Sequence, residues 1–181
     1  ALAGLPASAR WLPTDAAPVV DVGSGGGLPG IPIAIMRPSL PVVLVEPTGK
    51  KAAFLRQVVA ECGLVQALVR ETRLEAPSPE VLNGNSRHSS IAGAHFICRA
   101  FTSLAGFARL CAPRSGHDSL IMAMKAVRVE DELMELRASM PQMDVLAVEP
   151  LSLPGQAVQR NLVVMQPARA AAARPGTTPS G

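Results

Sequence analysis

Pro18-Val-Val-Asp-Val-Gly-Ser-Gly-Gly-Gly-Leu-Pro-Gly30 is the stretch that decides the fold of this chain. It opens with a short run of apolar, β-branched residues containing one acid, Asp21, which predicts a buried strand. Glycines follow at once, where a chain that turns from a strand into a helix benefits from backbone without β-carbons. Pro29 and Pro32 suit the first turn of a helix, which we expect to run to about Met36.

Apolar runs and helical patterns alternate after this stretch. Apolar runs predict later strands at 42–45, 67–69, 96–98, 119–124, 145–148 and 162–165. Helical spacing predicts helices at 50–62, from a cap at Ser103 to Cys111, and at 129–140. Five rounds of this alternation indicate an α/β fold, a doubly wound and mostly parallel sheet with helices on both faces. The last two strands lie close together and are expected to form an antiparallel pair.

Composition favours one domain without a membrane anchor. The chain has 181 residues, is 48% hydrophobic and 17% charged, and carries a net charge of +3. That charge permits a nucleic-acid partner without requiring one. No apolar run reaches the roughly 20 residues that cross a bilayer. We expect a cytoplasmic protein with a loose segment at 1–17, one domain at 18–166 and a disordered tail at 167–181.

Cysteine and histidine spacing gives no sign of a metal site. Cys62, Cys98 and Cys111 are far apart and show no CxxC spacing, which favours a reducing compartment. The three histidines share no helical face with one another or with a carboxylate, and we expect them to be solvated or incidental.

Candidate binding residues fall where predicted strands end. They are the loop Asp21–Gly30, Glu46, Glu75, Arg99 and Lys125. Ligands of doubly wound sheets bind at the carboxyl ends of the strands, near the point where strand order reverses. We therefore interpret these residues as parts of one site, with Asp21, Gly23 and Gly25 from the loop.

Glu46 makes the glycine loop more specific. Glycines alone also serve ordinary turns, but an acid about twenty residues after such a loop can bind the two hydroxyls of a ribose. A dinucleotide site prefers a third glycine where this chain has Leu28, counted from Gly23. Leucine there is expected to crowd the contact between helix and strand, which favours S-adenosylmethionine over a dinucleotide.

Four segments carry a family resemblance: Val20–Pro32, Gly49–Val58, Arg99–Phe101 and Asn161–Val164. With their Leu-Pro-Gly-Ile-Pro and Phe-Leu-Arg-Gln-Val sequences, they resemble the bacterial small-subunit (16S) ribosomal RNA guanine-N7 methyltransferases, the RsmG/GidB family. The likeness runs from about Pro18 to Gln166. It implies a Rossmann-like fold, S-adenosylmethionine as cofactor, and ribosomal RNA or the small ribosomal subunit as partner of a monomeric enzyme.

The resemblance also implies roles for single residues. It implies cofactor contacts at Gly23, Leu28, Leu74, Glu75 and Arg99, with Glu46 where the family usually has aspartate. Lys125 matches a family lysine after the fifth strand. Arg99 and Lys125 are candidates to position the substrate by donating to guanine O6. No catalytic residue is assigned, because guanine N7 has a lone pair and no proton to remove.

Some positions depart from the family pattern. The usual N-terminal helical segment is expected to be absent, the loop at 77–93 is longer, and Gly26, Cys98 and Ala126 replace the common residues. Two alternatives therefore stay open: a truncated, non-catalytic relative that binds cofactor, and a dinucleotide-dependent oxidoreductase.

Overall fold

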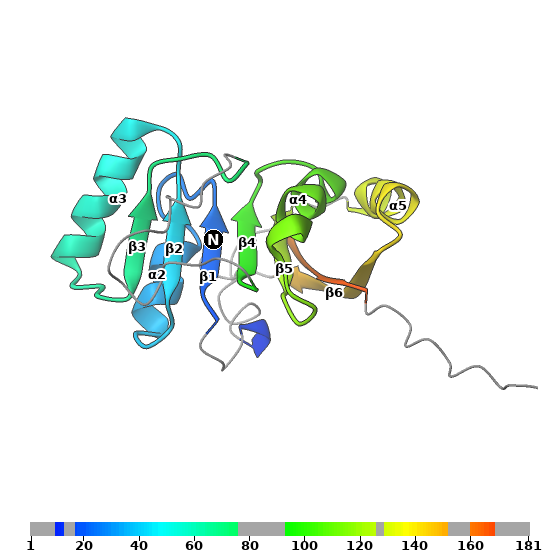
Figure 1. Ribbon diagram of the computed structural model, residues 1–181, viewed down its shortest axis with the longest axis horizontal. Helices are drawn as coiled ribbons and strands as arrows, with labels where there is room; N and C mark the ends of the chain where they lie inside the picture. Colours follow the sequence, from blue (N-terminus) through cyan, green and yellow to red (C-terminus); the bar gives the residue numbers. More distant parts are fainter. Residues whose placement is uncertain (1–9, 13–16, 76–92, 126–128, 152–159, 169–181) are drawn as a thin grey trace, which may run out of the picture.

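A seven-stranded sheet with the order β3-β2-β1-β4-β5-β7-β6 forms the centre of the protein (Figure 1). The computed structural model describes residues 10–12, 17–75, 93–125, 129–151 and 160–168. The strands are β1 (Val19–Val22), β2 (Val42–Val45), β3 (Ala67–Arg70), β4 (His95–Arg99), β5 (Ile121–Lys125), β6 (Met143–Leu151) and β7 (Arg160–Pro167). The helices are α2 (Gly30–Met36), α3 (Gly49–Glu61), α4 (Leu104–Cys111), the short 3₁₀ helix η2 (Ala112–Arg114) and α5 (Glu130–Ser139).

Strand direction confirms the predicted fold class. β3, β2, β1, β4 and β5 are parallel, whereas β7 runs antiparallel to β5 and to β6. From β1 the chain moves to β2 and β3 on one side, and then crosses to β4 on the other. The strand order therefore reverses between β1 and β4, and this is where a ligand site is expected in such a sheet.

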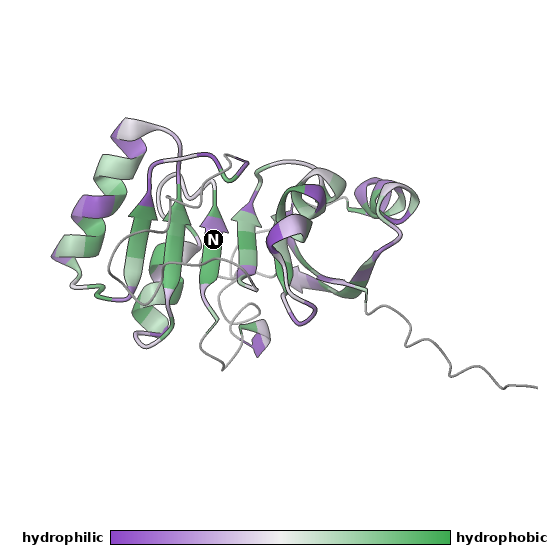
Figure 2. Cartoon of the chain, in the orientation of Figure 1, coloured by the Kyte–Doolittle hydropathy of each residue, from purple (hydrophilic) through white to green (hydrophobic). Residues whose placement is uncertain are grey.

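The central parallel strands β2, β1, β4 and β5 are buried on both faces, so their sequences are mostly apolar runs rather than alternating ones, whereas β3 at the sheet edge is half-buried. All four residues of β1 are buried, and in the register of the sheet Val19 lies between Val42 and His95. Figure 2 shows the hydrophobic colour along the central strands. The sheet edge that carries the strand ends is therefore the region where polar groups can gather.

Helices cover both faces, because successive strand residues point to opposite sides. Val20 and Val22 belong to one core cluster with Leu104 and Phe107 of α4. Val19 belongs to the other cluster, with Ile33 of α2, Leu55 of α3 and Leu44 of the neighbouring strand β2. Ser103 caps α4 as predicted, since its hydroxyl accepts from the Gly106 N–H at 3.1 Å. No helix in the described ranges is long and apolar enough to cross a membrane.

The antiparallel pair β6 and β7 confirms the predicted late strands and is longer than expected. The predicted loose segment includes residues 10–12, which pack against this pair: the Trp11 indole donates to Glu149 at 2.8 Å, and Leu12 is buried. β7 runs to Pro167, just past the expected end of the domain. The rest of the expected tail, from residue 169, lies outside the described residues, as do 76–92 of the long loop and Ala126.

His95 was predicted to be solvated or incidental, and the structure shows otherwise. It is buried at the start of β4, and its Nδ1 accepts a hydrogen bond from the Leu120 N–H at 3.0 Å. This bond joins β4 to the segment before β5, so the histidine has a structural role at the amino ends of the strands.

Candidate functional site

The glycine loop after β1 turns over the end of β2. The N–H groups of Gly23 and Ser24 both donate to the Val45 carbonyl, at 2.9 and 3.1 Å. Gly23 has a φ of +70°, which only glycine adopts without strain. A β-carbon there would lie 2.7 Å from Cδ2 of Phe101, so the ring of Phe101 packs directly against the backbone of the loop.

Asp21 supports this loop through a hydrogen bond with its last residue, Gly30. Its side chain has no exposed surface, and Oδ2 accepts from the Gly30 N–H at 2.9 Å, while Oδ1 has no hydrogen-bond partner. Burial raises the pKa of Asp21 to about 7, and the bonds from Gly30 and Ser24 only partly oppose this rise. In this position Asp21 supports the loop, and its expected contact with a ligand stays a prediction.

Glu46 connects the loop to the end of β2. Its two carboxylate oxygens accept from the N–H groups of Gly25 and Thr48, each at 2.9 Å, and the residue is 4% exposed. Burial alone would raise its pKa, but the bonds from Thr48 and Gly25 and the charge of Lys51 bring the pKa below the usual value. The Thr48 side chain also hydrogen-bonds to this carboxylate, whose two oxygens together offer about four acceptor positions, so the ionised side chain can still accept a further hydrogen bond.

A small cavity of about 70 Å³ lies beside the loop. It brings together three predicted site residues, Gly23, Leu74 and Glu75, and adds Phe101 from the segment after β4. Leu74 is buried and Glu75 is exposed at the rim. The cavity is also lined by Val22, Val45, Pro47, Thr72 and Arg73.

Leu28 does not lie where the sequence argument put it. It is half-buried, and the close contact between helix α2 and the strands falls on Gly30. A β-carbon on Gly30 would lie 2.3 Å from Cδ2 of Leu44. The reason given against a dinucleotide, crowding by leucine at this contact, is therefore wrong: the loop is longer than assumed, and glycine does occupy the packing position.

Arg99 and Lys125 differ from each other, although both end a strand. Arg99 is exposed, and its charge acts on Asp21, where it lowers the pKa. Lys125 has a side chain only 10% exposed, pairs with Glu132 at 2.8 Å, and donates to the Thr102 carbonyl at 2.6 Å. Glu132 also accepts from the Leu104 N–H at 2.7 Å. Lys125 therefore anchors the β4–α4 connection, and its expected role as a donor to the substrate stays a prediction.

Phe101 is the site residue that sequence reasoning missed. It belongs to a segment quoted for the family resemblance, but a single exposed phenylalanine carries no local signal of function. Ala100, just before it, has a φ of +48°, which is unusual for a residue other than glycine. A residue in such a conformation directly after a strand of the switch point is often functional.

Cys98 lies close to the site but is not a nucleophile. It is 1% exposed, and burial together with the charge of Asp21 raises its pKa far above that of an ordinary thiol. The thiol therefore stays protonated at neutral pH. Within the ranges that the structure describes, no three His, Cys, Asp or Glu side chains gather as metal ligands.

Sequence comparison identifies relatives over most of the chain. The family model described as rRNA small subunit methyltransferase G (GidB) matches residues 7–163. A protein of that name from Polynucleobacter asymbioticus is 39% identical over 168 residues, which cover 93% of this chain and 71% of the relative. The one from Nitrosomonas eutropha is 42% identical over 152 residues, covering 82% of this chain and 64% of the relative. The chain thus spans about two thirds of the length of these curated relatives.

Solved structures agree on the fold. The tRNA methyltransferase TrmK of B. subtilis has a TM-score of 0.66 at 12% identity, covering 91% of this chain and 65% of that one. The O-methyltransferase NcsB1 from neocarzinostatin biosynthesis has a TM-score of 0.63 at 21% identity, covering 84% and 49%. Both similarities confirm the predicted Rossmann-like methyltransferase fold. The match of the family model over residues 7–163 and the relative at 39% identity show that the chain belongs to the rRNA small subunit methyltransferase G (RsmG/GidB) family.

Proposed function

We propose that this chain is an S-adenosylmethionine-dependent methyltransferase that methylates N7 of a guanine in 16S ribosomal RNA. The observation that carries the proposal is the position of Glu46, whose ionised carboxylate holds the glycine loop of Gly23 and Gly25 at the switch point of the sheet. Membership of the methyltransferase G family supports the RNA substrate. We further propose that residues 18–166 form the methyltransferase domain.

The residues present fit S-adenosylmethionine. Gly23 lines the cavity beside the loop together with Leu74 and Glu75, and the ionised Glu46 at the end of β2 keeps acceptor capacity for a ribose hydroxyl. Leu28, Leu74, Glu75 and Arg99 would complete the contacts, with Asp21 holding the loop from below. When bound, the cofactor would supply a methyl group on a positively charged sulfur, which an attacking lone pair can take as the carbon–sulfur bond breaks and a neutral thioether leaves.

The chain needs no general base for this reaction, because guanine N7 carries a lone pair and no proton. The described part of the site accordingly offers no histidine or reactive thiol: His95 lies at the opposite ends of the strands and Cys98 stays protonated. Catalysis then consists of orienting the two reactants and excluding water. The purine becomes cationic as it accepts the methyl group, and the Glu75 carboxylate at the rim would stabilise that charge.

Calorimetric titration of the chain with S-adenosylmethionine and with NAD tests the cofactor. We expect binding of the methyl donor and none of NAD; the reverse would overturn the proposal in favour of an oxidoreductase. Small subunits from a strain that lacks this modification, incubated with the chain and methyl-labelled donor, test the reaction. We expect label on guanine N7 in 16S RNA. Donor binding without transfer would instead identify a non-catalytic relative.

The substrate also bears on cellular setting. Ribosomal RNA is available where ribosomes assemble, so we propose a cytoplasmic location and a monomer that acts on the small subunit. Fractionation of cells and light scattering after size-exclusion chromatography test these points. A dimer in solution, or recovery with the membranes, would contradict them.

A further inference from the structure

A second hollow adjoins the small cavity beside the glycine loop. It has a volume of about 500 Å³ and is lined by Glu75, Phe101, Thr102, Gly106, Arg109 and Leu110. Glu75 and Phe101 line the small cavity beside the glycine loop as well. Group transfer between two bound molecules needs two subsites that share a wall, and these two residues form such a wall.

Phe101 gives this hollow an aromatic surface. The chain has one tryptophan, four phenylalanines and no tyrosine, all of them described by the structure. Phe54 and Phe101 are the exposed members of this set, at 50% and 42%, and Phe54 lies on α3 and lines neither hollow. An exposed ring that lines a pocket can stack on a nucleobase, because every base presents a π-face.

The structure holds Phe101 in place on both sides. Ala100 donates to the Met124 carbonyl at 3.2 Å, and the Thr102 carbonyl accepts from Lys125 at 2.6 Å. The ring itself meets Phe107 edge to face, with 6.4 Å between the centroids. Because its backbone is fixed before any ligand binds, little conformational entropy is lost when a base stacks on the ring.

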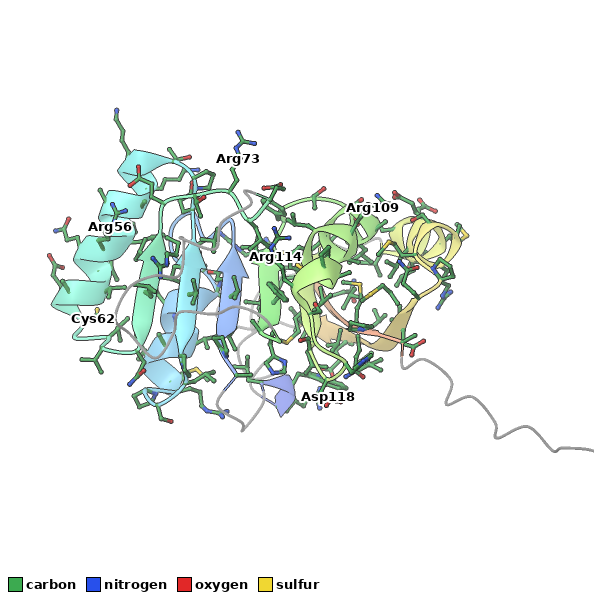
Figure 3. All side chains as sticks on the ribbon, viewed as in Figure 1. Arg56, Cys62, Arg73, Arg109, Arg114 and Asp118 are labelled. Carbon is green, nitrogen blue, oxygen red and sulfur yellow. The ribbon has the colours of Figure 1, made fainter. Side chains whose placement is uncertain are left out.

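Arg109 adds a cation to the same hollow. It is exposed on α4, and among the described residues it has no ion-pair partner. Figure 3 shows Arg109 on α4 on the same side of the molecule as Arg73. A guanidinium without a carboxylate partner is suited to bind a phosphate.

We propose that this hollow is the subsite for the target nucleotide, with the guanine stacked on Phe101 and a neighbouring phosphate bound by Arg109. The proposal rests on the proposed function and names the place where its substrate binds. The base then lies against the wall that the hollow shares with the small cavity beside the glycine loop. Glu75, in that wall, faces the purine as it becomes cationic.

Methylation kinetics with small subunits test the subsite, using F101L and R109Q with the matched controls F54L and R137Q. Because F101L removes the aromatic face on which the base stacks, we expect it to lower kcat/KM for the subunit about tenfold or more. R109Q should raise KM and reduce the slope of log KM against log salt by about one. Phe54 and Arg137 are exposed on helices outside both hollows, and their variants should match the wild type.

A second measurement separates the base from the phosphate. Guanosine 5′-monophosphate and guanosine are titrated by NMR into the chain loaded with S-adenosylhomocysteine. F101L should weaken both ligands, and R109Q should weaken only the phosphate-bearing one. The subsite would be overturned if the wild type binds the donor and methylates RNA while F101L and R109Q keep wild-type kinetics and nucleotide affinities. The proposed function would then still stand. Loss of donor binding in wild type would instead refute the function itself.

Discussion

The ring of Phe101 lies so close to Gly23 that a β-carbon on the glycine would be 2.7 Å from Cδ2 of the ring. This contact joins the loop after β1 to the segment after β4, across the point where strand order reverses. It is also where the two hollows meet. The most direct tests of the site therefore change the loop itself.

Gly23→Ala should damage donor binding. The new methyl group meets Phe101, and the φ of +70° adds strain of about 1–2 kcal/mol for an L-residue. We expect the Kd for S-adenosylmethionine to rise at least tenfold in calorimetry. Gly26→Ala controls for the loop, because its β-carbon meets nothing within 4 Å; Gly63→Ala controls for strain, at φ +59° outside the site. Equal loss in all three variants would contradict the prediction.

Glu46→Gln should weaken donor binding, because it changes both the support of the loop and the proposed contact with the ribose. An amide keeps one acceptor oxygen and turns an NH₂ group toward a backbone N–H that now lacks its partner, at Gly25 or Thr48. We expect at least a tenfold rise in Kd, with a lower melting temperature. Glu71→Gln, which changes an acid paired with Arg56 on the surface, is the control and should bind normally.

The pKa of Glu46 makes a related prediction about pH. Because it lies below the usual value, the stabilisation from Glu46 is present above the unfolded pKa near 4.5 and is lost only as pH falls through the lower folded value. Donor affinity limited by this carboxylate should therefore stay constant from pH 8 down to about 5. A decline centred near pH 6 in calorimetry would show that another group controls binding.

The raised pKa of Asp21 predicts that stability falls as pH rises, which is the opposite of the dependence that Glu46 gives. Its pKa rises from 3.8 to about 7 on folding, so the folded state holds more protons between these values and the free energy of unfolding falls as pH rises through them. The full effect is at most about 4 kcal/mol at 1.36 kcal/mol per pKa unit. Asp21→Asn should remove this part of the slope in urea unfolding at several pH values. Asp144→Asn, on the surface, should retain the slope of the wild type.

Lys125→Met should reduce stability by about 1–2 kcal/mol, because it leaves Glu132 without its cation and the Thr102 carbonyl without its donor. Urea unfolding measures this loss. Arg56→Met breaks the exposed pair with Glu71, which is about half-exposed, and should cost less than about 0.5 kcal/mol. Similar losses from the two variants would show that the Lys125 network is not a structural anchor.

The sequence by itself determined the fold class and most element positions. Val42–Val45 reads as a buried strand because all its residues are apolar, and the Ser103 cap is a local hydrogen bond. Such signals depend on neighbours along the chain, so they can be read without the tertiary structure. The family was determined in the same way, from runs such as Leu-Pro-Gly-Ile-Pro.

Only the tertiary structure decided what the residues at the strand ends do. Lys125 and Arg99 both end a strand, yet Lys125 forms an ion pair with Glu132 of α5, whereas Arg99 is exposed. The close contact of helix and strand fell on Gly30 rather than Leu28, and the ring of Phe101 came to lie beside Gly23. Each result depends on which distant segments the strand order brings together, and short-range apolar patterning does not encode those contacts.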